Sequence, residues 1–182
     1  MRSELRCRAR VRNWAARLLL APALCAAPAT ADPVPEHAMK AAFIFNFAVF
    51  VGWPLEALPA GAPLRLCASP DSPIYGAIEQ LNDKPVNGHR IALRQLPATP
   101  VRSCHMLVLA AQDRDDWPQW RHELSGASVL TVSDDRGIST GGAVIGLSSD
   151  YERIGFDVDM GAARAARLNL SSKLLRLARS VR

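Results

Sequence analysis

The thirteen residues from Ala41 to Trp53 carry a single polar side chain, Asn46, and this limits the folds open to the chain. A helix that crosses a bilayer needs about 20 apolar residues, so this segment is too short to span a membrane. We interpret His37 to Trp53 as a buried or half-buried helix that Gly52-Trp53-Pro54 ends. A helix that is apolar all round has to be covered on more than one side, by its own core or by a partner.

Four of the five phenylalanines of the chain lie in this apolar segment. Three of them are spaced i, i+4 and i+7 and share one helical face, and the fourth lies off that face. Core packing alone explains them, but the segment offers more apolar surface than a small core clearly needs. We therefore predict a partner-binding surface that includes Phe43, Phe45, Phe47 and Phe50.

The first thirty-one residues follow the order of a secretory signal peptide. An arginine-rich stretch precedes the apolar run from Leu18 to Ala27, and Ala29-Thr30-Ala31 offers a small-residue cleavage site. A retained amphipathic helix is one alternative, and lipid attachment at Cys25 is another, although Leu24 before it is bulky for a lipoprotein cleavage site. The expected organisation is a cleaved signal peptide (1–31), a flexible leader (32–36) and a single α/β domain (37–182).

The net charge changes once this peptide is set aside. The whole chain carries 22 Lys+Arg and 17 Asp+Glu, of which six bases and one acid lie in residues 1–31. The remainder is therefore neutral, and a neutral domain gives no support for nucleic-acid binding. The signal peptide has the pattern of a bacterial secretory signal, so we predict that the mature protein is located in the periplasm.

The predicted mature chain keeps two cysteines, Cys67 and Cys104. In an oxidising compartment the simplest interpretation of two cysteines is one disulfide, and two buried thiols are the alternative. No CxxC motif and no His/Cys cluster accompanies them. The sequence therefore supports no metal site and indicates no cofactor.

Strand and helix signals alternate along the rest of the chain. Met106 to Ala110 is a continuous apolar run, typical of a strand that is buried on both faces. The alternation predicts an α/β fold: a mixed, mostly parallel sheet, flanked by helices on both faces, with an antiparallel hairpin at one edge. Further strands are expected at Leu64–Ala68, His89–Leu96, Val129–Ser133, Ala143–Leu147 and Arg153–Met160, and further helices at Pro73–Leu81, Trp117–Leu124, Ala162–Arg167 and Ser171–Ser180. Turns are expected at Asn87-Gly88 and at Asp134 to Gly137.

Residues suited to catalysis do not converge in the sequence. Asp157 and Asp159 share one face of a predicted strand. Two carboxylates on one face can act as an acid/base pair, but a solvent-exposed strand face accounts for them equally well. The glycines between Gly137 and Gly142 match neither a dinucleotide-binding motif nor a P-loop. We therefore predict a binding protein and not an enzyme. A hydrolase that uses Asp157, Asp159 or His105 is a further hypothesis.

A run of basic residues lies near the C-terminal end. Such residues can receive phosphate or an acidic partner, although arginines along helices are commonly solvated. The residues concerned are Arg164, Arg167, Lys173, Arg176 and Arg179.

Several segments together resemble the YfiR family of periplasmic proteins. They occur in family order, and they cover nearly all of residues 32–182. Cys67 and Cys104 match one cysteine pair of the family, whereas a second pair toward the C-terminal half is absent, so redox control by that second bridge does not carry over. The matching segments are KAAFIFNFAVFVGWP (40–54), LRLCAS (64–69), SCHMLVL (103–109), LTVSDDRGISTGGAVIGL (130–147) and IGFDVDMGAARAARLNLSSKLLRLAR (154–179).

The resemblance implies an α/β domain, often dimeric, without known catalysis. It implies a periplasmic protein that binds the sensor domain of an inner-membrane diguanylate cyclase and represses it, which lowers cyclic-di-GMP, exopolysaccharide and biofilm formation. An outer-membrane lipoprotein of the OmpA-like class is implied as a second partner that sequesters the repressor. The alternative is a periplasmic small-solute-binding sensor that partners a membrane histidine kinase. Its site would lie at the carboxyl ends of the strands, with Ser133 to Gly142 as its loop.

Overall fold

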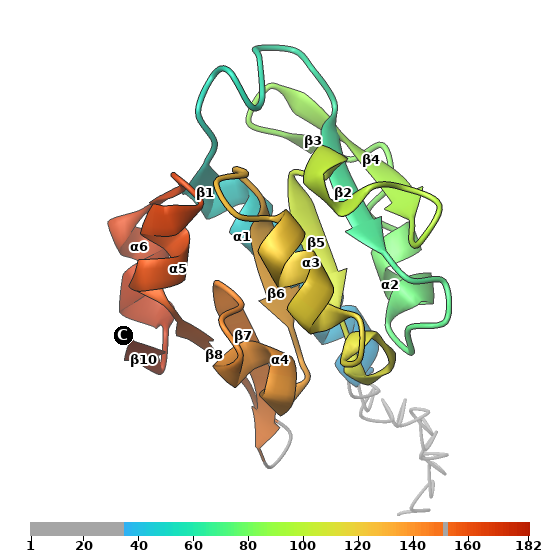
Figure 1. Ribbon diagram of the computed structural model, residues 1–182, viewed down its shortest axis with the longest axis vertical. Helices are drawn as coiled ribbons and strands as arrows, with labels where there is room; N and C mark the ends of the chain where they lie inside the picture. Colours follow the sequence, from blue (N-terminus) through green and yellow to red (C-terminus); the bar gives the residue numbers. More distant parts are fainter. Residues whose placement is uncertain (1–34, 151–152) are drawn as a thin grey trace, which may run out of the picture. The chain divides into compact units, whose positions relative to one another are not determined.

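An eight-stranded mixed sheet forms the centre of the domain (Figure 1) in a computed structural model that describes residues 35–150 and 153–182. The strands of the sheet are β2 (Leu64–Ala68), β3 (Pro85–Val86), β4 (His89–Gln95), β5 (Met106–Leu109), β6 (Leu130–Ser133), β7 (Ile145–Asp150), β8 (Arg153–Val158) and β10 (Ser180–Val181). Their order is β10-β8-β7-β6-β5-β2-β4-β3. The predicted signal peptide lies outside the described residues.

The five central strands, β4, β2, β5, β6 and β7, run parallel. β8 returns antiparallel to β7, β10 pairs with β8, and β3 lies antiparallel to β4 at the other edge. This arrangement confirms the predicted α/β class with its mostly parallel sheet and its antiparallel hairpin. The chain passes from β2 to β4 on one side and then to β5 on the other, so the strand order reverses between β2 and β5.

Helices cover both faces of the sheet. The helices are α1 (Glu36–Phe50), α2 (Tyr75–Glu79), α3 (Trp117–Glu123), α4 (Arg136–Thr140), α5 (Met160–Ala165) and α6 (Ser172–Leu177), with short 3-10 turns η1 (Val101–Ser103) and η2 (Ala111–Asp113). Buried residues of α1, α2, α5 and α6 share one hydrophobic core, and those of α3 and α4 belong to a second. The two cores lie on opposite faces because successive strand residues alternate between them.

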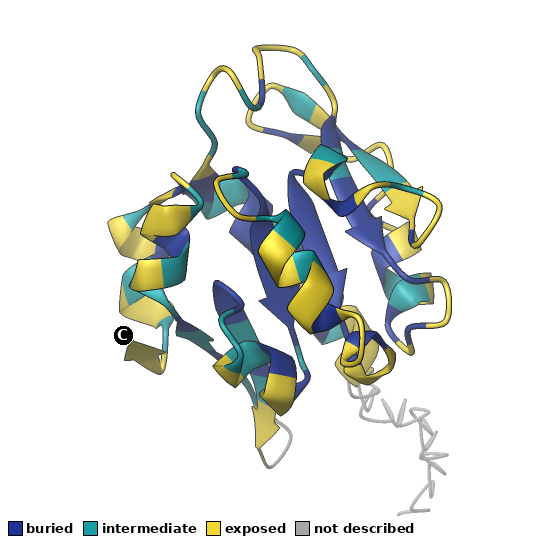
Figure 2. Ribbon diagram, viewed as in Figure 1, coloured by how far each residue is buried: buried dark blue, intermediate teal, exposed yellow. Residues whose placement is uncertain are grey.

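β5 shows this alternation directly. Met106 and Val108 belong to the core under α1, whereas Leu107 and Leu109 belong to the core under α3. All four residues of β5 are buried, which confirms the prediction for this strand, and Figure 2 shows the central strands as the most buried part of the domain. Full burial of each large apolar side chain contributes about 1.5–3 kcal/mol to folding.

A disulfide between Cys67 and Cys104 joins β2 to the segment between η1 and β5, with the Cα atoms 5.9 Å apart. Both residues are buried in the core that packs beneath α3. The predicted bridge is therefore present, and it closes a loop that contains β3 and β4.

Several predicted boundaries change. β8, for example, ends at Val158, so Asp159 lies outside the predicted strand and caps α5 (Met160–Ala165) instead. α1 ends at Phe50, because Val51 and Gly52 form the short strand β1, which pairs antiparallel with β9 (Asn169–Leu170). The expected turn at Asp134 to Gly137 is instead the start of α4, where the Asp135 carboxylate accepts a hydrogen bond from the Ile138 N–H at 3.0 Å. α6 stops at Leu177, because Ser180 and Val181 pair with β8 as β10.

Within residues 35–150 and 153–182, no helix combines the length and hydropathy that a bilayer crossing requires. Over the same described ranges, no three His, Cys, Asp or Glu side chains gather into a group able to hold a metal ion.

Candidate partner-binding surface

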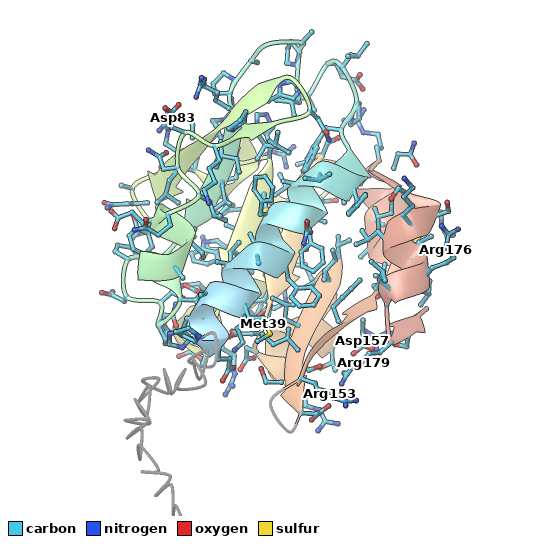
Figure 3. All side chains as sticks on the ribbon, turned by 180° about the vertical axis from the view of Figure 1, so that it is seen from behind. Met39, Asp83, Arg153, Asp157, Arg176 and Arg179 are labelled. Atoms are coloured by element: carbon cyan, nitrogen blue, oxygen red, sulfur yellow. A yellow bond between two sulfur atoms is a disulfide. The ribbon has the colours of Figure 1, made fainter. Side chains whose placement is uncertain are left out.

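α1 lies across the sheet, packed between α2 on one side and α6 on the other (Figure 3). Its inner face holds Ile44 and Phe47, which have no exposed surface. Its outer face carries Ala42 and Asn46, which are exposed, and Phe45 and Val49, which are half-buried. The helix is thus apolar on its outer side as well, as the sequence indicates.

The four phenylalanines of α1 lie in different environments. Phe47 is buried and packs edge-on against Phe156 of β8, with the ring centroids 5.1 Å apart. Phe43 is half-buried and contacts the same Phe156 ring at 6.0 Å. These aromatic contacts fix α1 to the sheet. Phe47 therefore supplies no outer surface in the single chain, whereas Phe43, Phe45 and Phe50 remain half-exposed.

Phe45 lines a groove between α1 and α2, which we call the α1–α2 groove. The groove has a volume of about 420 Å³. Its other lining residues are Ala38, Ala41, Ala42, Asn46, Ala77, Gln80, Leu81 and Lys84. Small alanines on both helices leave this volume open, and Phe45 is the one aromatic ring in the lining. Aromatic side chains are enriched where proteins bind one another.

An ion-pair network fixes the first turns of α1. The Lys40 ammonium lies 2.8 Å from a carboxylate oxygen of Asp134, at the carboxyl end of β6, and 2.8 Å from Glu36. Burial lowers the pKa of Lys40, but its hydrogen bonds to Asp134 and Glu36 outweigh burial, and the pKa is raised. The hydrogen bond from Lys40 lowers the pKa of Glu36. Both shifts favour the charged forms that hold the helix in place.

The other end of α1 is also fixed. The Asn87 side-chain amide donates a hydrogen bond of 2.8 Å to the Val49 carbonyl, near the end of the helix. Asn87 adopts a positive φ of 47° in the tight turn with Gly88, which confirms the predicted turn. Because both ends are held, the outer face of α1 is presented in one orientation.

His105 plays a structural role at the amino end of β5. Its Nδ1 accepts a hydrogen bond from the Arg65 backbone N–H at 2.9 Å, and its Nε2 lies 3.0 Å from the Ala57 carbonyl oxygen. The Trp53 indole N–H donates to the His105 carbonyl at 3.0 Å. Burial lowers the pKa of the His105 imidazole, and the nearby Arg65 cation lowers it further. The ring therefore ties the segment after α1 to the sheet.

Asp157 and Asp159 are also occupied by structural contacts. The Asp159 carboxylate accepts a hydrogen bond from the Ala162 N–H at 2.8 Å and so caps α5. The Asp157 carboxylate lies 3.0 Å from the Arg179 guanidinium. β8 is separated from β5 by two strands, and Asp157 lies level with Leu109 at the other end of β5, so the backbone of His105 is at least about 14 Å from that of Asp157. The three residues of the hydrolase hypothesis do not form one site.

A second, polar pocket lies over β7 and β8 beside α4, with a volume of about 600 Å³. Four residues of the predicted loop line it, together with side chains from β7, β8 and the C-terminal segment. Arg179, one of the predicted C-terminal bases, also lines this pocket. It lies across Gly155, where a Cβ would collide with it, and it pairs with Asp150 at 2.6 Å. The loop residues in the lining are Asp134, Arg136, Ser139 and Thr140.

The fold is a small α/β domain whose surface carries the apolar α1–α2 groove and the larger polar pocket. The family model described as YfiR/HmsC-like matches residues 37–179, and the chain belongs to that family. The members are periplasmic regulators of cyclic-di-GMP signalling, and the family is regulatory and not catalytic.

The chain is similar to solved structures at low sequence identity. A conserved domain protein from Vibrio cholerae O1 biovar El Tor is 11% identical, with a TM-score of 0.50 over 82% of this chain and 61% of that chain. The ABC domain in complex with L-Trp from Streptococcus pneumonia is 7% identical, with a TM-score of 0.48 over 70% of this chain and 59% of that chain. This chain thus spans about three fifths of the length of each. No curated protein matches the sequence.

Proposed function

We propose that the protein binds the periplasmic sensor domain of an inner-membrane diguanylate cyclase and represses it. Repression lowers cyclic-di-GMP and so restrains exopolysaccharide and biofilm formation. The observation that carries this proposal is the family match over residues 37–179, which spans the domain from α1 to α6. The disulfide between Cys67 and Cys104 supports a periplasmic location, because disulfides form and persist in oxidising compartments.

The α1–α2 groove is the proposed contact with the cyclase. Its alanines allow a partner helix or side chain to approach closely, and Phe45 supplies a rigid aromatic anchor. Lys84, Gln80 and Asn46 form the polar part of the lining. An apolar centre with a polar rim is the usual anatomy of a reversible protein interface.

Repression by binding requires a preference for one state of the sensor. A regulator shifts a conformational equilibrium only by the difference between its affinities for the two states. The rigid seating of α1, held by Lys40 at one end and by Asn87 at the other, suits such a preference. A surface fixed in one orientation loses less entropy when it binds.

The binding experiment uses the purified sensor domain of the cyclase encoded in the same genome. Phe45→Glu places a charge in the groove, and we expect it to weaken binding by at least about 30-fold, the effect of losing an interface anchor. Leu55→Glu is the matched control, because Leu55 is an exposed apolar residue outside the groove, with 75% of its surface exposed. Circular dichroism checks that both variants are folded. Wild-type affinity in folded Phe45→Glu would exclude the groove as the interface.

Two further partners belong to the same proposal. An OmpA-like outer-membrane lipoprotein sequesters the repressor and so relieves inhibition, and a second copy of the chain forms a homodimer. Competition between purified lipoprotein and sensor domain tests the first of these partners. Light scattering during size-exclusion chromatography tests the second, and a monomer mass at working concentration would exclude the dimer.

The polar pocket favours a second candidate function, a small-solute sensor that partners a membrane histidine kinase. Residues of the predicted Ser133 to Gly142 loop line this pocket, which is large enough for a metabolite. A thermal-shift screen with small polar metabolites distinguishes the two functions. A ligand that raises the melting temperature, and loses this effect in Arg136→Gln, would support the sensor function.

A further inference from the structure

The two parts of the domain carry opposite net charges. Residues 153–182 contain seven Lys or Arg and two Asp, whereas residues 35–150 contain nine Lys or Arg and twelve Asp or Glu. The positive part comprises β8, α5, α6 and β10, which lie at one side of the sheet (Figure 1). The charge is therefore concentrated on one region of the surface.

α6 combines this charge with exposed apolar side chains. Lys173, Arg176 and Leu177 are spaced i, i+3 and i+4 on one face of the helix, and all three are exposed. Leu177 has 68% of its surface exposed, and Val181 of β10 has 48%. Together with Leu55 at a distant loop, these two are the exposed large hydrophobic residues of the described chain. We call Lys173, Arg176 and Leu177 the α6 surface.

The cations of the α6 surface are available to a ligand. Among the residues that the structure describes, neither Lys173 nor Arg176 forms an ion pair. Two neighbouring arginines do form ion pairs: Arg167 pairs with Glu56, and Arg179 pairs with Asp150 and Asp157. Figure 3 shows Arg176 on the outer side of the helix. The α6 surface is thus an exposed patch of uncompensated positive charge around an exposed leucine.

The composition of this patch fits a lipid surface better than a protein. Protein interfaces are enriched in aromatic residues and depleted of lysine, and the α6 surface has a lysine and no aromatic residue. Aliphatic side chains set among Lys and Arg are typical of elements that lie at a membrane interface, where cations contact headgroups and apolar groups enter the acyl boundary. We propose that the α6 surface docks the protein onto anionic phospholipid of a membrane, with Leu177 entering the headgroup layer.

Docking through α6 leaves the proposed protein interface open. α6 packs along one side of α1, and the α1–α2 groove lies along the other. The protein can therefore rest on a bilayer and bind a membrane protein beside it at the same time. Lipid docking does not depend on the identity of that membrane protein, so its test stands apart from the proposed function.

The experiment measures sedimentation of the periplasmically expressed protein with vesicles of phosphatidylglycerol mixed with phosphatidylcholine, and with vesicles of phosphatidylcholine alone. Each cation near an anionic lipid surface contributes about a five-fold factor to the partition coefficient. K173Q/R176Q should therefore lower the partition coefficient about 25-fold. R90Q/R94Q is the matched control, because it removes two exposed cations at the opposite edge of the sheet and should leave binding nearly unchanged. Added salt should weaken wild-type binding.

Leu177→Asn tests the apolar part of the docking surface, and Leu55→Asn is its control at a similar exposure. We expect weaker sedimentation for Leu177→Asn alone, with all variants folded by circular dichroism. Wild-type protein that stays in solution with phosphatidylglycerol vesicles would overturn the proposal. An equal loss in R90Q/R94Q would also overturn it, because net charge alone would then explain binding. Retention on immobilised polyglutamate without vesicle binding would assign the patch to an acidic protein.

Discussion

Lys40 and Asp134 are 94 residues apart in sequence, yet the Lys40 ammonium lies 2.8 Å from the Asp134 carboxylate and ties the first turns of α1 to the carboxyl end of β6. Asp134 is half-buried, and Lys40 is buried. The same lysine also reaches Glu36 one turn earlier. The pair therefore determines where the outer face of α1, with Phe45, lies on the domain.

Removing the lysine should destabilise the fold. Lys40→Met leaves the Asp134 carboxylate half-buried without its cation, so we expect a loss of about 2 kcal/mol, below the roughly 3–5 kcal/mol of a fully buried pair. Urea denaturation of Lys40→Met, Asp134→Asn and the double variant measures the coupling between them. If the two single losses simply add in the double variant, the ion pair contributes nothing of its own.

The disulfide should be a major source of stability. The loop closed by Cys67 and Cys104, with a sequence separation of 37, corresponds to about 4 kcal/mol by the chain-entropy estimate. We expect Cys67→Ala/Cys104→Ala to lose a few kcal/mol in urea denaturation. Mass spectrometry of non-reduced periplasmic protein should show the two cysteine peptides linked. Free thiols in freshly prepared protein would contradict the bridge.

Stability should fall as the pH falls through the histidine range, because burial and the Arg65 cation lower the pKa of His105 in the folded state. The unfolded chain then binds the proton first, so stability declines once the pH drops below the unfolded value of about 6.5. The slope for this one proton cannot exceed about 1.4 kcal/mol per pH unit.

His105→Asn is the control for this pH dependence, because its amide oxygen can still accept the hydrogen bond from the Arg65 N–H without titrating. Urea denaturation between pH 5 and pH 8 compares the two proteins, a range above the usual titration of carboxylates. Wild-type protein whose stability is constant over this range would show that His105 is not held neutral by the fold.

The residue pattern predicted elements whose signal is local. Leu64–Ala68 is a strand with the predicted bounds, and the fully apolar β5 is buried on both faces as its sequence indicates. The end of α1 was not predictable from local sequence, because Val51 leaves the helix to pair with Leu170 of β9, far along the chain. The order of the strands in the sheet could not be predicted either, because it also depends on contacts between residues that are far apart in the sequence.

The candidate surface was predictable only in part. Helical spacing groups Phe43, Phe47 and Phe50, but no local signal shows that Phe156 of β8 covers Phe47. The α1–α2 groove requires α2 to pack beside Phe45, which is a tertiary contact. The sequence groups Arg179 with the other C-terminal bases, whereas the structure places it over Gly155 between the carboxylates of Asp150 and Asp157.

The central claim is that this chain represses a diguanylate cyclase by binding, and intracellular cyclic-di-GMP tests it most directly. The strains are a deletion mutant, its parent, and the deletion complemented with wild type, Phe45→Glu or Leu55→Glu. We expect cyclic-di-GMP to rise on deletion, and to return to the parental level with wild type and Leu55→Glu but not with Phe45→Glu. An unchanged cyclic-di-GMP level in the deletion strain under several growth conditions would contradict the account.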